Sequence, residues 1–223
     1  MGDCFKGTGK RTTEIRELAS FDKILVQGNI DIIFTQGPVQ EVKVEAGAKL
    51  IPLIKTEVDD SNKVHIRNDN RCNWARSYKK GNITVHITCP KLSLIKHFGS
   101  GFITNTDTFT VDTLEIFAIE TGDLDMTVNA NVIFTRNLGT TDITLHGKTF
   151  CLGNFHTGEG NHHCEDIRAD YVWSYSKASG NEYYHPIKDL SATIQWDGDV
   201  FYKATNATTK RQGTGSGNLI RID

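Results

Sequence analysis

The feature of this chain that most restricts its fold is a short turn sequence that returns about every nineteen residues. The turn is a glycine, then an asparagine or aspartate, then an apolar residue, and its clearest copies begin at Gly81, Gly122, Gly198 and Gly217. Weaker copies fill the gaps and begin at Gly101, Thr141, Gly160 and Gly180. Consecutive copies are then 18 to 21 residues apart, a period typical of repeat proteins whose units stack on one another.

The residues between the turns have the pattern of β-strands. Val, Ile and Thr are frequent, and apolar residues alternate with polar ones, for example over residues 123–128. We predict an all-β fold, a single-stranded and right-handed β-solenoid with rungs of about 19 residues, because such a unit can bury its apolar residues only by stacking. The alternative is a two-sheet sandwich, in which Leu124 and Ile143 would not be neighbours in parallel rungs.

Two columns of residues are expected to face the core of the solenoid. The first lies two residues after each turn begins and contains Ile83, Ile103, Leu124, Ile143, His162, Glu182, Val200 and Leu219. The second lies eight residues before the turn and contains Leu114, Ile133, Leu152, Val172 and Leu190. Because an isolated buried charge is costly, we expect His162 and Glu182 to form a paired or hydrogen-bonded arrangement in the core.

The turn residues indicate how the corners are built. Glycine tolerates the left-handed backbone of a sharp corner, so we expect Gly122→Val to cost more than about 1 kcal/mol of stability. The second turn position is Asn or Asp in seven of the eight copies. In a stacked coil these side chains would form a ladder that bonds the backbone of their own corner or of the next rung.

We divide the chain into an N-terminal tail, residues 1–15, and one solenoid domain, residues 16–223. Within the domain, residues 16–80 are expected to form irregular rungs and residues 81–223 regular ones. The apolar spacing over residues 11–18 fits a short helical turn. No linker rich in proline, serine or charge separates the two parts.

Composition excludes two classes of partner. The chain has 25 Lys and Arg against 27 Asp and Glu, a formal net charge of −2, whereas nucleic-acid-binding domains carry a basic excess. The apolar runs are far shorter than the ~20 residues of a transmembrane helix. We therefore expect no nucleic-acid partner and no transmembrane segment. The cysteines form no CxxC pair, which leaves the disulfide state open for Cys4, Cys72, Cys89, Cys151 and Cys164.

The outer face offers one candidate metal site. Counted from the turns, His146, Glu165 and His185 would lie on consecutive rungs, where side chains about 4.8 Å apart could converge on zinc. A solvated face of mixed polar residues is the commoner outcome of such a pattern. The segment 71–80 interleaves cations with two aromatic residues, a pattern that binds single-stranded nucleic acid or an anionic glycan but also occurs where a Trp packs back on a coil.

Sequence motifs for catalysis are missing. The chain contains no GxSxG, HExxH or GxxxxGK[ST] motif. The clearest outward carboxylate, Asp125, has only Thr104 and Thr144 as its expected column neighbours. We therefore assign no catalytic residue, no cofactor-binding residue, no metal ligand and no cofactor.

From Arg16 onward the chain resembles the family described as "putative auto-transporter adhesin, head GIN domain", secreted or lipid-anchored proteins mainly of Bacteroidetes. The resemblance lies in residues 16–24, 28–32, 37, 42–46, 50–51, 89–92, 99–101 and 215–218. It implies an extracytoplasmic location, periplasmic or at the cell surface, and carries over no catalytic residue. The family usually begins with an export signal that ends at a lipidated cysteine. Cys4 stands near that place, and its position suggests a lipid anchor at the N-terminus, although no lipobox precedes it.

We therefore expect a non-enzymatic, exported, adhesin-like protein that presents a rigid solenoid surface to a glycan or to an extracellular protein. The alternative is a carbohydrate-active β-helix enzyme of the lyase or hydrolase type, which would need two carboxylates about 5 to 10 Å apart in a groove. A contact patch is expected where one outward column changes from small polar residues to aromatic ones. This column contains Thr84, Thr104, Asp125, Thr144, His163, Tyr183 and Phe201, although its rings could instead pack under the chain that follows Thr205.

Overall fold

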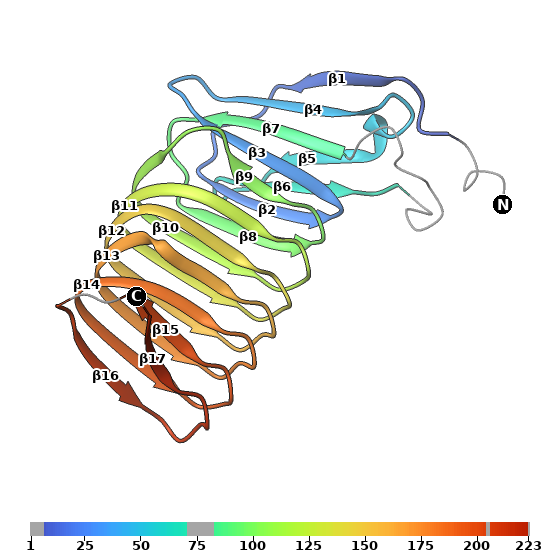
Figure 1. Ribbon diagram of the computed structural model, residues 1–223. Helices are drawn as coiled ribbons and strands as arrows, with labels where there is room; N and C mark the ends of the chain where they lie inside the picture. The colour runs from blue at the N-terminus through green and yellow to red at the C-terminus, as the bar shows by residue number, and fades with distance from the viewer. Residues whose placement is uncertain (1–6, 71–82, 204–205, 223) are drawn as a thin grey trace.

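The computed structural model describes residues 7–70, 83–203 and 206–222, so the basic and aromatic segment 71–80 lies outside the described residues. The chain forms a β-solenoid of about seven turns with rungs of about 19 residues. Figure 1 shows the later rungs stacked in chain order, with β1 at one end of the coil and β17 at the other. The predicted all-β fold and its solenoid architecture are confirmed.

The described residues contain seventeen strands and one short 3₁₀ helix. The strands before the regular coil are β1 (Arg11–Arg16), β2 (Lys23–Gly28), β3 (Ile30–Gln36), β4 (Glu41–Gly47), β5 (Ile54–Val58) and β6 (Lys63–Asn68), with the 3₁₀ helix η1 at Ile51–Leu53. The others are β7 (Ile83–Cys89), β8 (Leu94–Gly99), β9 (Ile103–Asn105), β10 (Phe109–Ala118), β11 (Leu124–Asn137), β12 (Ile143–His156), β13 (His162–Ser176), β14 (Glu182–Ile194), β15 (Val200–Lys203), β16 (Thr208–Gln212) and β17 (Leu219–Ile222). No helix in this part of the chain is long and apolar enough to cross a membrane.

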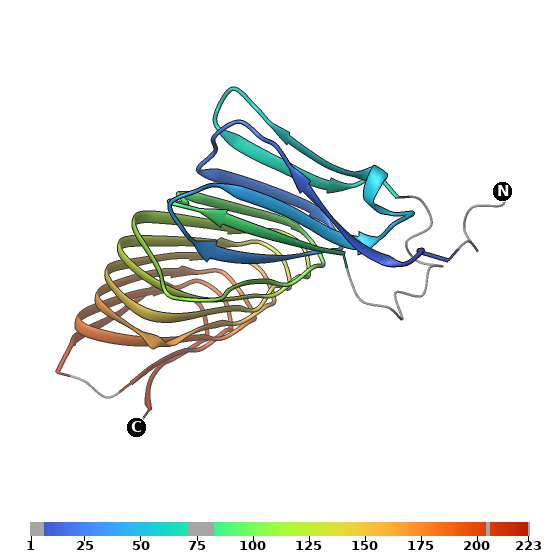
Figure 2. The same ribbon diagram turned by 90° about the horizontal axis from the view of Figure 1, so that it is seen from above.

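The strands form two sheets, mostly parallel, that meet at a bend. The first sheet has the order β1, β4, β7, β3, β9, β11, β12, β13, β14, β15, β17. The second sheet has the order β5, β6, β2, β8, β10, β11, β12, β13, β14, β16. Each of the four long strands β11 to β14 continues through the bend from the first sheet into the second. Figure 2 shows these strands as nested arcs in consecutive rungs.

The register confirms the second core column and the first from Ile103 onward, although Leu219 in the last rung is only half-buried. Ile83 is buried but out of register, because Val85 is the residue that aligns with Ile32 and Ile103. Leu124 pairs with Ile143 in the parallel ladder of β11 and β12, which excludes the antiparallel sandwich. The first column is at most 1% exposed from Ile83 to Val200, and the second is at most 2% exposed from Leu114 to Leu190. The stacked rungs therefore share one continuous apolar core, which is the source of stability in a repeat fold.

The corner glycines are needed for a different reason from the one predicted. The positive-φ glycines among the described residues are Gly9, Gly28, Gly147 and Gly213, so Gly122 does not use the left-handed backbone. A Cβ atom on Gly122 would instead lie 2.1 Å from the carbonyl oxygen of Gly101 in the neighbouring rung and 2.4 Å from the His97 ring. Glycine occupies these corners because the backbones of successive rungs are in contact there.

The predicted asparagine and aspartate ladder is present, and it bonds neighbouring rungs. The backbone N–H of Asp142 donates to the Asp123 carboxylate at 2.9 Å, and the N–H of Asn161 donates to the Asp142 carboxylate at 2.7 Å. The same bond recurs at Asn181, Asp199 and Asn218. Each side chain thus satisfies a corner N–H group that no strand ladder reaches.

The early rungs are not stacked in the order of the sequence. The repeat places the turn at Gly81 directly before the turn at Gly101, but β3 lies between β7 and β9. The match between Gly28-Asn29-Ile30 and the turn sequence therefore marks a rung inserted between two later ones. This arrangement is possible because β3 presents the same alternating apolar residues as the rungs on either side of it.

The N-terminal end of the coil is closed by antiparallel strands. The predicted helical turn over residues 11–18 is wrong, because β1 pairs antiparallel with β4 over Arg11–Arg16. The strand β1 therefore begins within the stretch expected to be a tail. β4 in turn pairs antiparallel with β7, and β5 pairs antiparallel with β6, so both sheets end in strands that break the parallel stack.

Candidate functional site

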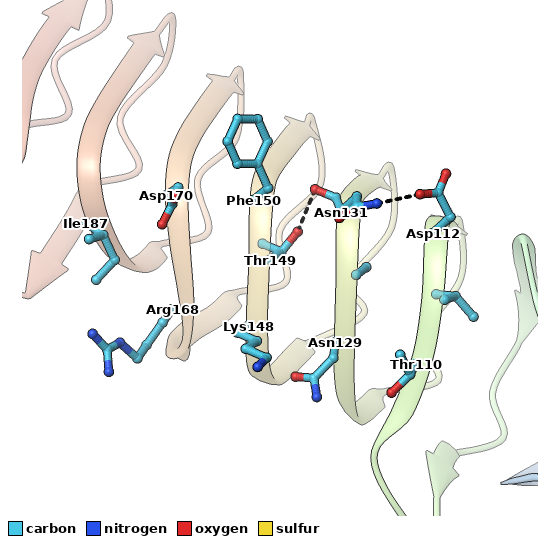
Figure 3. Close-up of a pocket in the computed structure, with 12 residues that line it drawn as sticks. Thr110, Asp112, Asn129, Asn131, Lys148, Thr149, Phe150, Arg168, Asp170 and Ile187 are labelled. Atoms are coloured by element: carbon cyan, nitrogen blue, oxygen red, sulfur yellow. Dashed lines mark hydrogen bonds between the residues drawn. The ribbon is translucent and has the colours of Figure 1, made fainter.

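An open groove runs across the rungs on the outer surface where the two sheets meet. Its volume is about 720 Å³, and it is lined by residues of β10 to β14 (Figure 3). The groove forms where the alternation of inward and outward residues along the strands is interrupted, as the burial pattern of β11 shows. Its buried positions alternate as far as Val128 and resume five residues later at Ile133. The residues between them face outward or are only half-buried, and they create a channel perpendicular to the strands.

The groove has a middle row and two flanks, each built from equivalent positions in successive rungs. The middle row contains Val111, Ala130 and Thr149. One flank contains Thr110, Asn129, Lys148 and Arg168. The other flank contains Asp112, Asn131, Phe150 and Asp170, as Figure 3 shows. Because each row repeats with the rung spacing of about 4.8 Å, the groove presents similar chemistry several times along its length.

One rim of the groove carries an exposed aromatic pair. Phe150 is 54% exposed and Tyr171 is 40% exposed, and their rings meet edge to face with centroids 5.2 Å apart. The Lys188 ammonium lies 6.0 and 5.6 Å from the two ring centroids and forms an ion pair of 2.7 Å with Asp170. These contacts hold the rings in place without covering them, so a preformed apolar surface stands beside charged hydrogen-bonding groups.

The opposite flank is cationic. Lys148 and Arg168 are exposed and occupy paired positions in β12 and β13. His185 follows in the next rung, paired with Arg168. Burial, together with the positive charges of Lys203 and Arg168, lowers the pKa of His185. The charge of this flank at neutral pH therefore comes from Lys148 and Arg168.

The carboxylates of the groove do not have the spacing of a glycosidase. Asp112 and Asp170 lie three rungs apart, a separation of about 14 Å, whereas the paired carboxylates of such enzymes are about 5 to 10 Å apart. Each is already engaged. Asp112 accepts hydrogen bonds from Asn131 at 2.5 Å and from Thr113 at 3.2 Å, and Asp170 is paired with Lys188. Asp112 and Asp170 therefore do not form the acid and base pair of a glycosidase.

The three residues of the candidate metal site are not brought together. A β-bulge between β12 and β13 sets His146 beside Asp166, and a second irregularity sets His185 beside Arg168, so Glu165 is in register with neither. Across the described part of the chain, no group of three His, Cys, Asp or Glu side chains is placed to hold a metal ion.

His146 instead belongs to a charge ladder on the flat face of the first sheet. Its Nε2 lies 3.1 Å from the Asp125 carboxylate and its Nδ1 lies 3.7 Å from the Asp166 carboxylate. The Lys203 ammonium lies 2.9 Å from Asp166 and, through this hydrogen bond, lowers the pKa of that carboxyl. Asp125 has Thr104 and Thr144 as neighbours, as predicted. These partly exposed side chains pair with one another, and none of them lines the groove.

The predicted pair of His162 and Glu182 is part of a buried polar network. The two residues are paired in neighbouring rungs and are fully buried. The hydrogen bonds to Glu182, however, come from elsewhere. His156 Nδ1 lies 3.1 Å from one carboxylate oxygen, and the hydroxyls of Tyr184, at 2.8 Å, and Ser174 donate to the other. The network stabilises the interior of the coil and is closed to any ligand.

The same cluster makes the fold sensitive to acid. Burial, followed by the charge of His156, lowers the pKa of His162 to about 3. Below about pH 6.5 the unfolded chain therefore takes up a proton that the folded chain does not. The free energy of unfolding consequently decreases as the pH is lowered. Glu182 acts in the same direction. Burial, the largest cause, opposes its ionisation, but the hydrogen bond from His156, the charges of His162 and His156 and the hydrogen bond from Ser174 together outweigh burial and lower its pKa.

We therefore expect the melting temperature to fall steadily from about pH 7.5 to about pH 4.5, measured by circular dichroism. The His162→Phe variant should lose part of this fall, because neither ring nitrogen of His162 has a hydrogen-bond partner among the described residues and phenylalanine does not titrate. A fall of equal size in the variant would show that other groups cause the acid sensitivity.

The aromatic column predicted on the first sheet forms a stack. His163, Tyr183 and Phe201 occupy paired positions in β13, β14 and β15, and their ring centroids are 5.1 and 4.9 Å apart in nearly parallel planes. The rings are half-buried and cover one another's faces, so they offer less free apolar surface than Phe150. Thr84 does not belong to this column, because it pairs with Asp31 and with Glu45 of β4.

The cysteines in the described residues are structural thiols. Cys89, Cys151 and Cys164 are free, and burial raises the pKa of each thiol. A raised pKa keeps the thiol protonated and poorly reactive. Cys4 and Cys72 lie outside the described residues.

Sequence reasoning missed the groove residues, above all Lys148, Phe150 and Arg168. Reading each rung from its corner gives the columns of the first sheet, but the groove lies farther along, where the strands bend. The signal was present in the broken alternation between Val128 and Ile133. A five-residue gap between inward positions indicates a bend, and bends are where a solenoid surface can become concave.

Fold and groove together define the class of this protein, a β-solenoid repeat protein with an open groove across its rungs. The chain belongs to the family described as "Putative auto-transporter adhesin, head GIN domain", which matches residues 20–205. The family resemblance seen in the sequence is thereby confirmed. No protein among those with curated descriptions matches this chain.

Three solved structures share this fold over nearly the whole length of the chain. The chain is similar to a "putative adhesin" of Bacteroides fragilis, with 23% identity, a TM-score of 0.86, and coverage of 96% of this chain and 97% of that one. It is also similar to a "putative lipid binding protein" of Parabacteroides distasonis, with 16% identity, a TM-score of 0.74, and coverage of 97% and 98%. A "putative adhesin" of the same organism gives 20% identity, a TM-score of 0.67, and coverage of 97% and 98%. At these identities the likeness establishes the shared solenoid fold.

Proposed function

We propose that this protein is an exported, adhesin-like binding protein that holds a glycan in the groove across β10 to β14 and does not turn it over. The observation that carries the proposal is the exposed pair Phe150 and Tyr171 beside a groove of about 720 Å³ with hydrogen-bonding side chains on both flanks. Aromatic rings stack on the apolar faces of sugars, and amide, hydroxyl and carboxylate groups bond sugar hydroxyls. The family's adhesin description supports the same role and an extracytoplasmic location.

Two alternatives fit the groove less well. An enzyme of the β-helix type would need a closely spaced acid and base, whereas the groove carboxylates are three rungs apart and engaged in other bonds. A lipid-binding role would need an apolar lining for an acyl chain. The groove contains apolar residues, among them Val111, Ala130 and Ile187, but its two flanks are polar or charged at every position except Phe150, which suits hydroxyl groups.

The proposal predicts that Phe150→Ala combined with Tyr171→Ala will weaken glycan binding by about tenfold or more, because both stacking faces are lost. Binding would be measured on a glycan array and then by calorimetry with the best oligosaccharide. The melting temperature should change by only a few degrees, since both side chains are largely exposed.

The matched control replaces Tyr183 and Phe201 with alanine on the other face. This variant removes two aromatic rings as well, and it should retain binding. Unchanged binding in the groove variant, or loss only in the control variant, would contradict a glycan site in the groove. Release of shortened sugar products by the purified protein would contradict the non-enzymatic role.

A further inference from the structure

We propose that the ligand of the groove is an acidic glycan that lies along the coil axis, with its anionic groups on Lys148 and Arg168 and a sugar ring on Phe150. The inference rests on the proposed glycan-binding function and names the ligand class of the same site. It is argued from the charges of the two flanks, from the spacing of three side chains, and from what the strand geometry excludes.

The charges of the groove are unevenly satisfied. Both carboxylates on the aromatic flank have partners. Asp112 accepts hydrogen bonds from Asn131 and Thr113, and Asp170 accepts one from Lys188. On the cationic flank, neither Lys148 nor Arg168 forms an ion pair with any residue that the structure describes. A charged group without a partner at the edge of a concave site favours a ligand of opposite charge. The flank therefore selects for anions such as carboxylate or sulfate.

The spacing of the side chains fits an acidic sugar. Lys148 and Arg168 lie in adjacent rungs, about 4.8 Å apart, so both can contact one anionic group or two successive ones. Phe150 is two residues beyond Lys148 on the same strand, about 6.6 Å away along the backbone. A pyranose ring placed on Phe150 can therefore direct an exocyclic acid group toward Lys148. The guanidinium group of Arg168 can donate two parallel hydrogen bonds to the same acid group.

Two other polymers suit the groove less well. A nucleic acid would bring phosphates past Asp112 and Asp170 on the facing flank, and the chain as a whole has a net charge of −2. An extended peptide would gain no main-chain hydrogen bonds, because the groove crosses the strands and the backbone groups of β11 to β13 are used by the parallel ladders. Side chains alone can supply the hydrogen bonds that a glycan needs.

The test compares three matched ligands, namely oligogalacturonate, its carboxyl-reduced neutral counterpart, and a sulfated dextran oligosaccharide. Wild-type protein should bind at least one of the anionic ligands about tenfold or more tighter than the neutral one, and its binding should weaken as salt is raised. Preference for oligogalacturonate would assign the anion as a carboxylate, and preference for sulfated dextran would assign it as a sulfate ester.

The Lys148→Gln and Arg168→Gln double variant should lose this preference and bind charged and neutral ligands equally. A second double variant, Lys177→Gln and Lys210→Gln, removes the same charge outside the groove and should behave like wild type. Equal binding of charged and neutral ligands by wild type, with loss in Phe150→Ala, would overturn the acidic-glycan inference and leave the proposed function standing. Binding to none of the three, or binding to DNA or peptide in their place, would overturn both.

Discussion

Replacement of Gly122 with valine is expected to lower the free energy of unfolding by more than about 3 kcal/mol. The valine Cβ would start 2.1 Å from the carbonyl oxygen of Gly101, and real side chains never approach backbone so closely. The rung would have to move away from its neighbour, which breaks the corner bonds and opens the core on both sides. Urea denaturation followed by circular dichroism measures the change.

The matched control is Gly153→Ala in the second sheet. Its Cβ would also be crowded, at 2.7 Å, but the atom it meets belongs to the Phe134 side chain, which can rotate away. We expect a cost of less than about 1 kcal/mol. If Gly122→Val were as mild as this control, the corners could not be the points at which successive backbones are in contact.

Replacement of Glu182 with alanine is expected to destabilise the protein by about 3 to 5 kcal/mol. The carboxylate is fully buried and accepts hydrogen bonds from His156, Ser174 and Tyr184. Its removal leaves three buried donors without their acceptor and leaves a cavity between the two sheets. The same denaturation experiment gives the change in the unfolding free energy.

Glu182→Gln is the control for the network, because it keeps the volume and one acceptor oxygen and removes the charge. We expect it to cost about 1 to 2 kcal/mol. It should also remove part of the acid sensitivity, since glutamine does not titrate. If alanine and glutamine were equally mild, the network would contribute little, and packing of the neighbouring apolar residues would account for the core.

The architecture explains how a repeat with little chemical variety can carry a groove with its own side-chain chemistry. Corners and inward columns are restricted by the stacking of rungs, so their residues are small or apolar. The outward positions at the bend of β10 to β14 are not restricted in this way, and there the chain places Lys148, Phe150 and Arg168 in consecutive rungs or on one strand. Function can then vary by substitution at the bend without disturbing the fold.

The sequence by itself determined the period, the parallel stacking and the residues of the core. Leu124 and Ile143 could be placed side by side because a fixed period assigns equivalent residues to equivalent positions, and stacking keeps them in contact. The ladder from Asp123 to Asn218 was predictable for the same reason. Each of these features follows because every rung repeats the residue pattern of the rung before it.

Only the tertiary structure decided what breaks the period. β3 is inserted between β7 and β9, which no periodic count reveals, because the apolar pattern of a rung fits several places in the stack equally well. One bulge on β13 places Asp166 beside His146, in the position that the periodic count gave to Glu165. A single extra residue has this effect because it shifts every contact after it. The groove arises in the same way. Lys148 and Phe150 line one groove because their strand bends, and a bend depends on how both sheets close around one core.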